Sequence, residues 1–157
     1  MLRIALLFAA LSVAFSVSAQ SFENEVPAKD VPKAVRKAAK DLDYKGDGTW
    51  VNVHSDHYVM FGDKGMDIQL EGATVIAHTQ MVEAPIPTEY AEVKHNVEQA
   101  FVGHGYSYLA YGETTLANGD KQLSVYLEMQ GKPKALLVIA FDSNNKLVKR
   151  RIYKKQS

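Results

Sequence analysis

The chain of 157 residues contains no cysteine, which excludes disulfides, zinc–thiolate sites and thiol nucleophiles. It has no excess of charge of either sign, because 18 Lys and Arg residues balance 18 Asp and Glu residues. No global field therefore favours nucleic acid or an anionic membrane as the partner. The sequence also lacks the serine-elbow, zinc-protease and phosphate-cradling glycine motifs. We expect a protein that is not an enzyme and needs no cofactor or metal.

Only one long hydrophobic run is present, and it lies at the N-terminus over residues 4–17. Arg3 precedes it, and the small residues Val17-Ser18-Ala19 follow it, which is typical of a secretory signal peptide over residues 1–19. The run is shorter than the roughly 20 apolar residues of a membrane span, so we expect no membrane anchor. A secreted chain without cysteine suits a bacterial periplasm, and we predict a periplasmic or secreted protein that begins at Gln20.

The mature chain repeats one order of elements. Apolar residues recur at helical spacing over residues 32–42 and again over residues 86–101, and glycine pairs follow both segments. After each helix the hydrophobic period changes to two, which predicts four strands joined by short turns. The predicted strands cover residues 49–54, 57–61, 66–70, 74–80, 106–116, 122–129, 135–141 and 147–153. The sequence therefore predicts an α+β fold, a tandem repeat of one helix followed by a four-stranded antiparallel meander.

Several of these residues carry a family resemblance. The pattern Val31-Pro32-x-x-Val35, the strand residues Trp50 and Tyr58, and the segment Ala140-Phe141-Asp142-x-x-Asn145-Lys146-Leu147 resemble the PepSY-like, or beta-lactamase-inhibitor-like, family of exported bacterial proteins. The resemblance covers two units, residues 26–82 and 84–155, after an N-terminal extension over residues 20–25. It implies a curved antiparallel sheet with the helices on one face and an uncovered face that grips another protein.

Hairpin alternation assigns side chains to these two faces. If Ser55-Asp56 is a two-residue loop, His54 pairs with His57 and Trp50 pairs with Phe61, so Trp50 and Phe61 lie opposite the helix. The same count about Asn118-Gly119 puts Tyr111 and Tyr126 on the uncovered face. The predicted partner-binding surface is Trp50, Phe61, Tyr111 and Tyr126. The alternative is that these rings pack on a loop, on the other unit or on a dimer mate.

Two further features admit a functional interpretation. His54 and His57 face each other across their hairpin and are the best-placed pair of metal ligands, but a zinc site normally takes three protein ligands. The last strand is basic, with cations that fall on both of its faces. Such a strand either guards against edge-to-edge aggregation or meets an acidic partner or anionic surface. The cations are Lys146, Lys149, Arg150, Arg151, Lys154 and Lys155.

Three function classes follow. The leading hypothesis is an exported, non-catalytic protein-binding module, such as an inhibitor of a periplasmic or secreted enzyme. The alternatives are a small-ligand or metal-binding module that uses His54 and His57, and a structural envelope protein that dimerises through its sheet. We also expect Leu42 and Val125 to lie in the core, so that an aspartate at either position unfolds the protein.

Overall fold

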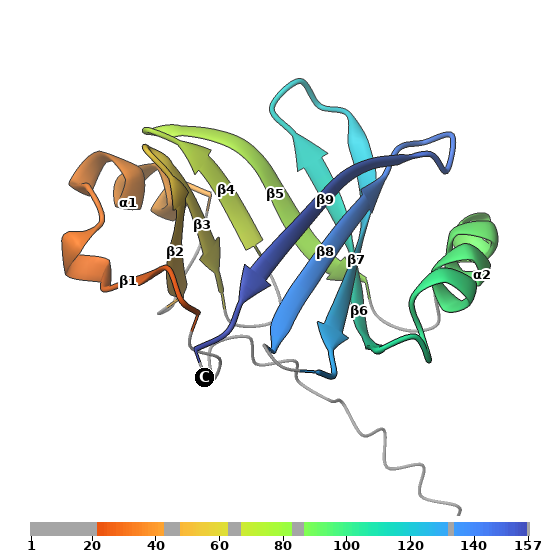
Figure 1. Ribbon diagram of the computed structural model, residues 1–157. Helices are drawn as coiled ribbons and strands as arrows, with labels where there is room; N and C mark the ends of the chain where they lie inside the picture. The colour runs from red at the N-terminus through yellow and green to blue at the C-terminus, as the bar shows by residue number, and fades with distance from the viewer. Residues whose placement is uncertain (1–21, 43–47, 63–66, 83–86, 132–133, 157) are drawn as a thin grey trace, which may run out of the picture.

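The computed structural model describes residues 22–42, 48–62, 67–82, 87–131 and 134–156 (Figure 1). The two α-helices are α1 (Lys33–Lys40) and α2 (Ala91–Ala100), and short 3-10 turns precede them at Ala28–Asp30 and Thr88–Tyr90. The strands are β1 (Glu25–Val26), β2 (Thr49–His54), β3 (His57–Phe61), β4 (Asp67–Glu71), β5 (Thr74–Val82), β6 (Tyr106–Leu116), β7 (Lys121–Met129), β8 (Ala135–Phe141) and β9 (Leu147–Lys154).

All nine strands belong to one antiparallel sheet, in which each strand pairs with the next along the chain. The predicted fold class, two tandem units of a helix and a four-stranded meander, is therefore wrong. β5 pairs with β6 from Ala77–Leu116 to Val82–Tyr111, so no break separates the two expected halves. The helices are short, with eight and ten residues, and the N-terminal extension contributes strand β1. The architecture is one curled sheet with two small helices.

The two ends of the sheet meet at one point of the curl. The backbone N–H of Glu23 donates to the carbonyl oxygen of Lys154 at 2.9 Å, and Phe22 forms an isolated bridge with Lys155. The ring of Phe22 stacks on Phe61 with centroids 5.3 Å apart and meets Tyr153 edge-on at 6.1 Å. Figure 1 shows β9 approaching β1 and β2 near the C-terminus and diverging from them above. These contacts therefore hold the first and last strands together at one end of the curl, and the strands are apart at the other end.

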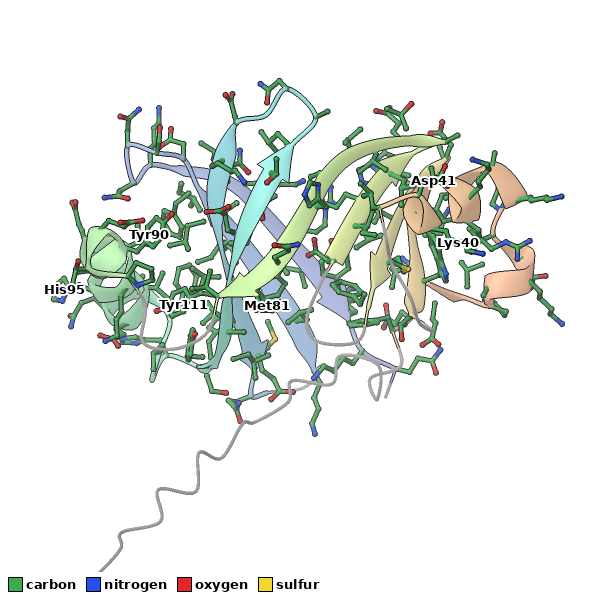
Figure 2. The ribbon with its side chains drawn as sticks, turned by 180° about the vertical axis from the view of Figure 1, so that it is seen from behind. Lys40, Asp41, Met81, Tyr90, His95 and Tyr111 are labelled. Atoms are coloured by element: carbon green, nitrogen blue, oxygen red, sulfur yellow. The ribbon has the colours of Figure 1, made fainter. Side chains whose placement is uncertain are left out.

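Alternation along the strands separates an outer face, which carries the helices, from an inner face. Val31, Val35 and Ala39 at α1 pack on Trp50 and on neighbouring outer-face residues of β3 and β4. The side chains of Val93 and Val97 on α2 pack on a second outer cluster of β6, β7 and β8. Figure 2 shows the two helices at opposite ends of the sheet. A third cluster of buried residues lies on the inner face, inside the curl. Its members are Phe22, Val51, Val59, Phe61, Tyr126, Leu136 and Tyr153.

The predicted pairing of β2 with β3 is wrong by one residue beyond the turn. His54 does pair with His57, but the register shifts between Asn52 and His54, so that Trp50 lies opposite Met60. A bulge of this kind places one extra residue, here Val53, on one strand and moves the preceding side chains to the other face. Trp50 consequently points towards α1 rather than away from it.

The hairpin between β6 and β7 also differs from its prediction. Gly119 adopts a φ of 90°, its N–H donates to the carbonyl of Leu116, and Thr115 pairs with Lys121. The loop is therefore one residue longer than the expected Asn-Gly turn, and the glycine provides the left-handed conformation that such a loop requires. Tyr111 lies opposite Val125 on the face that α2 covers.

The predicted signal peptide, residues 1–19, lies outside the described residues, as does the expected unit boundary at residue 83. Among the residues that the structure describes, no helix is long and apolar enough to span a membrane.

Candidate functional site

The four aromatic residues predicted to bind a partner are all buried. Trp50 and Tyr111 lie on the outer face beneath α1 and α2, and Phe61 and Tyr126 lie on the inner face. The exposed fraction of each is 6% or less. Tyr111 is enclosed enough that burial, followed by the charge of Glu98, raises the pKa of its phenol to about 12. The four rings do not form one exposed face, and binding through them stays a prediction.

The inner face holds a polar cluster beside its aromatic core. The hydroxyl of Tyr126 donates to a carboxylate oxygen of Asp67 at 2.6 Å, and both residues are fully enclosed. The hydroxyl of Thr114 lies 2.7 Å from that of Thr79 and 2.6 Å from that of Ser124, across three neighbouring strands. Burial raises the pKa of Asp67, and the Tyr126 hydroxyl only partly offsets this. The hydrogen bond between Tyr126 and Asp67 ties β4 to β7 through the interior of the curl, while the other carboxylate oxygen of Asp67 is buried without a hydrogen-bond partner among the described residues.

Two cations of β9 enter the same interior from the opposite wall. The ammonium of Lys149 donates to the side-chain oxygen of Gln69 at 2.6 Å, and a guanidinium nitrogen of Arg151 lies 3.4 Å from the same oxygen. Burial, and then the charge of Arg151, lowers the pKa of Lys149. The cavity between these groups has a volume of about 20 Å³, which holds one water molecule and no substrate. The interior polar groups therefore join β9 to β4 across the curl.

The histidine pair predicted as a candidate metal site is adjacent, with ring centroids 5.1 Å apart. His57 is buried, and its Nε2 lies 3.4 Å from a guanidinium nitrogen of Arg151. Burial, followed by the charge of Arg151, lowers the pKa of His57 to about 4. Among the described residues no three His, Asp or Glu side chains form a cluster that could hold a metal ion. The pair has neither a third ligand in that part of the chain nor a charge environment that favours a cation.

The exposed apolar side chains of the sheet are concentrated on β9. Ile152, Val148 and Leu147 have exposed fractions of 45%, 46% and 47%, and β9 is the last strand of the sheet. Basic residues alternate with them: Arg150 and Lys154 are exposed, and Lys149 and Arg151 are half-buried. None of these four cations forms a salt bridge with any carboxylate of the described residues. The strand thus combines apolar contact area with uncompensated positive charge.

A groove of about 210 Å³ runs beside this strand, between β9 and the β1–β2 edge. Its apolar walls come from Val51 and Val53 on β2 and from Phe22, Ile152 and Tyr153, and its polar lining includes Arg151 and Lys154. The groove exists because Phe22 and Glu23 pair with β9 only at its end, while β1 pairs with β2 over two residues. The open side of the curl therefore leaves a space where another strand would complete the sheet.

Sequence reasoning identified the basic residues of this strand but missed its apolar ones. The signal was present, because Leu147, Val148 and Ile152 are interleaved with the cations. Phe22 was missed as well, since it lies in a segment interpreted as an extension, although an isolated aromatic in such a segment is a candidate for core packing.

Comparison with known proteins gives little beyond the fold. No family model matches the chain, and no curated protein does. Among solved structures, a BLIP-like protein from Bacteroides fragilis is 12% identical, with a TM-score of 0.45 over 81% of this chain and 87% of its own. A DUF2874 family protein from Bacteroides uniformis is 16% identical, with a TM-score of 0.46 over 77% and 88%. Likeness at this level carries no argument about the family or the function of this chain.

Proposed function

We propose that the protein is an exported, non-catalytic protein-binding module that holds its partner on β9 and in the adjoining groove. The observation that carries this proposal is the strip of exposed apolar residues, Leu147, Val148 and Ile152, on the terminal strand of the sheet. Ile152 also lines the groove, and exposed apolar side chains that follow one strand mark a contact surface better than scattered single residues do. The partner class is a protein of the periplasm or a secreted one, and an enzyme that the module inhibits belongs to this class.

The binding surface differs from the one expected from the sequence. The aromatic rings predicted for this role hold the fold together, so a partner meets the smaller side chains of β9 and the walls of the groove. Arg150 and Lys154 at the rim would steer and orient that partner, because uncompensated charges affect association rate and specificity. The alternatives, a metal-binding module and an envelope protein that dimerises through its sheet, have no comparable exposed feature in the described part of the chain.

The proposal is tested by site-specific photo-crosslinking in cells that produce the protein natively. A photoreactive phenylalanine analogue at Ile152 is expected to yield a discrete crosslinked protein, since this side chain is exposed beside the groove. The same analogue at Gln99, an exposed position on α2, is the control. A crosslink from both positions, or from neither, would contradict binding at β9.

A further inference from the structure

We infer that the occupant of the groove is an extended acidic segment of a partner protein, which adds to β9 as a tenth antiparallel or parallel strand. This inference rests on the proposed function and names the recognition chemistry of the same site.

Among the described residues, the peptide groups of Arg150 and Ile152 on β9 have no strand partner. In an antiparallel ladder, successive residues direct their peptide groups to alternate sides of the strand. Since the N–H of Lys155 donates to Lys134 on the β8 side at 2.9 Å, the peptide groups of Ile152 and Arg150 face away from β8. The carbonyl of Lys154 faces the same way and accepts from Glu23. Among the described residues, no other strand pairs with β9 between residues 147 and 152.

The positive charge of β9 favours an acidic occupant. Four of the eight residues of β9 are basic and none is acidic. Both sides of an added strand would meet cations, because Arg150 and Lys154 lie on the outer face and Lys149 and Arg151 on the inner one. Acidic side chains on the outer side of an added strand would pair with Arg150 and Lys154, while apolar ones on its inner side would contact Val53 across the groove.

Other occupants from the same chain fit less well. A second copy that pairs β9 with β9 would bring the basic residues of both strands together, and like charges across a strand pair are destabilising. The chain's own residues 1–21 include no aspartate or glutamate, so they cannot supply the complementary charge. A folded acidic surface would match the cations but would leave the peptide groups of Arg150 and Ile152 without strand partners. An extended acidic segment satisfies both the charge and the backbone.

The test uses the full-length chain and defined peptides. The probe is a blocked seven-residue peptide that alternates glutamate and valine, and its matched control alternates lysine and valine. Binding is measured by titration calorimetry, and amide hydrogen exchange is followed by NMR. We expect the acidic peptide to bind, to slow amide exchange of Arg150 and Ile152 at least tenfold, and to weaken as salt is added. The basic peptide, and an acidic peptide with alternate backbone N-methyl groups, should not bind.

Variants of the protein separate charge from fold. The double variant Arg150→Glu and Lys154→Glu should bind the acidic peptide at least tenfold more weakly than the wild type does. The matched control replaces Lys33 and Lys40 with glutamate. Both are exposed cations on α1, which does not line the groove, so the affinity should be unchanged. Equal losses in both double variants would overturn the inference, because they would reflect net charge alone.

Three other outcomes would also overturn it. These are no binding of the acidic peptide, binding without slowed exchange of Arg150 and Ile152, and binding only of vesicles that contain anionic phospholipid. The last outcome would assign the cations to a membrane surface. A discrete crosslink from Ile152 without strand addition would retain the proposed protein-binding function and refute only the extended acidic segment. The absence of a crosslink, despite acidic-peptide binding, would refute the function instead.

Discussion

Replacement of His57 by glutamine should remove much of the protein's loss of stability between neutral pH and pH 4. In the folded protein the imidazole is buried on the inner face, beside the guanidinium of Arg151, and its pKa is about 4 instead of 6.5. In the unfolded chain the ring takes up a proton as the pH falls through 6.5, whereas the folded protein takes it up only near pH 4. The contribution of a neutral His57 is therefore fully present above pH 6.5 and is lost as the pH falls to about 4.

The size of this effect follows from the interval between the two pKa values. Each pH unit by which the folded-state pKa lies below the unfolded-state pKa corresponds to about 1.4 kcal/mol of unfolding free energy. The interval from 6.5 to about 4 therefore sets an upper limit of roughly 3 kcal/mol on the contribution of His57. His57 keeps 7% of its surface in water at the rim of the curl, which screens part of the interaction. We therefore expect the wild-type protein to lose about 1–3 kcal/mol of unfolding free energy relative to His57→Gln between pH 7 and pH 4.

Urea unfolding, followed by the fluorescence of the single tryptophan at pH 7, 5.5 and 4, measures this difference directly. The matched comparison is His54→Gln, at the exposed position across the hairpin. It removes only the contribution of the His54 charge to the lowered pKa of His57, which is smaller than those of burial and Arg151, so it should reduce the loss of stability much less than His57→Gln does. A constant difference between wild type and His57→Gln from pH 7 to pH 4 would refute the reasoning. NMR titration of His57 would then be expected to show an ordinary pKa.

Three further substitutions test the packing of the sheet by chemical denaturation. Gly112→Ala should destabilise the fold by about 1–3 kcal/mol, because the new Cβ would overlap the Cγ2 of Thr79 on the neighbouring strand. An unchanged midpoint would show that the strands can separate there. Val125→Asp should unfold the protein, whereas Leu42→Asp, at a position 38% exposed, should cost under about 1 kcal/mol, and equal effects would contradict the assigned core. Tyr126→Phe should cost about 1.5–3 kcal/mol, since it removes a hydroxyl donor from a buried carboxyl group, and a neutral effect would mean that water replaces it.

The positions of the strands could be predicted from the sequence because strand period and turn residues are local signals. The sheet that they build could not, because the pairing of β5 with β6 and the contact of Glu23 with Lys154 join segments by long-range contacts. The burial of Val125 was predicted and is confirmed, since alternation in β7 is regular. Leu42 was wrongly placed in the core because α1 ends at Lys40, so the helical stripe does not reach it.

Two single-residue features explain why the predicted faces of Trp50 and Tyr111 were wrong. The bulge at Val53 and the longer loop at Gly119 each shift the register by one residue, which moved Trp50 and Tyr111 to the helix-covered face. Phe61 and Tyr126 were assigned to the correct face, but the curl encloses that face. Alternation fixes which side chains share a face, and it contains no information on whether the sheet curls around that face. The degree of exposure of a strand residue therefore depended on contacts such as Phe22 with Tyr153.

The exposed edge of β9 connects the fold with the proposed function. A free strand edge with apolar side chains invites pairing with any extended chain, and proteins commonly guard such an edge with charge. In this protein Arg150 and Lys154 oppose pairing with a second copy, because the copy presents the same positive charges. The same cations do not oppose an acidic segment; they favour it. The residues that protect the edge from self-association would therefore also determine the charge of the partner it accepts.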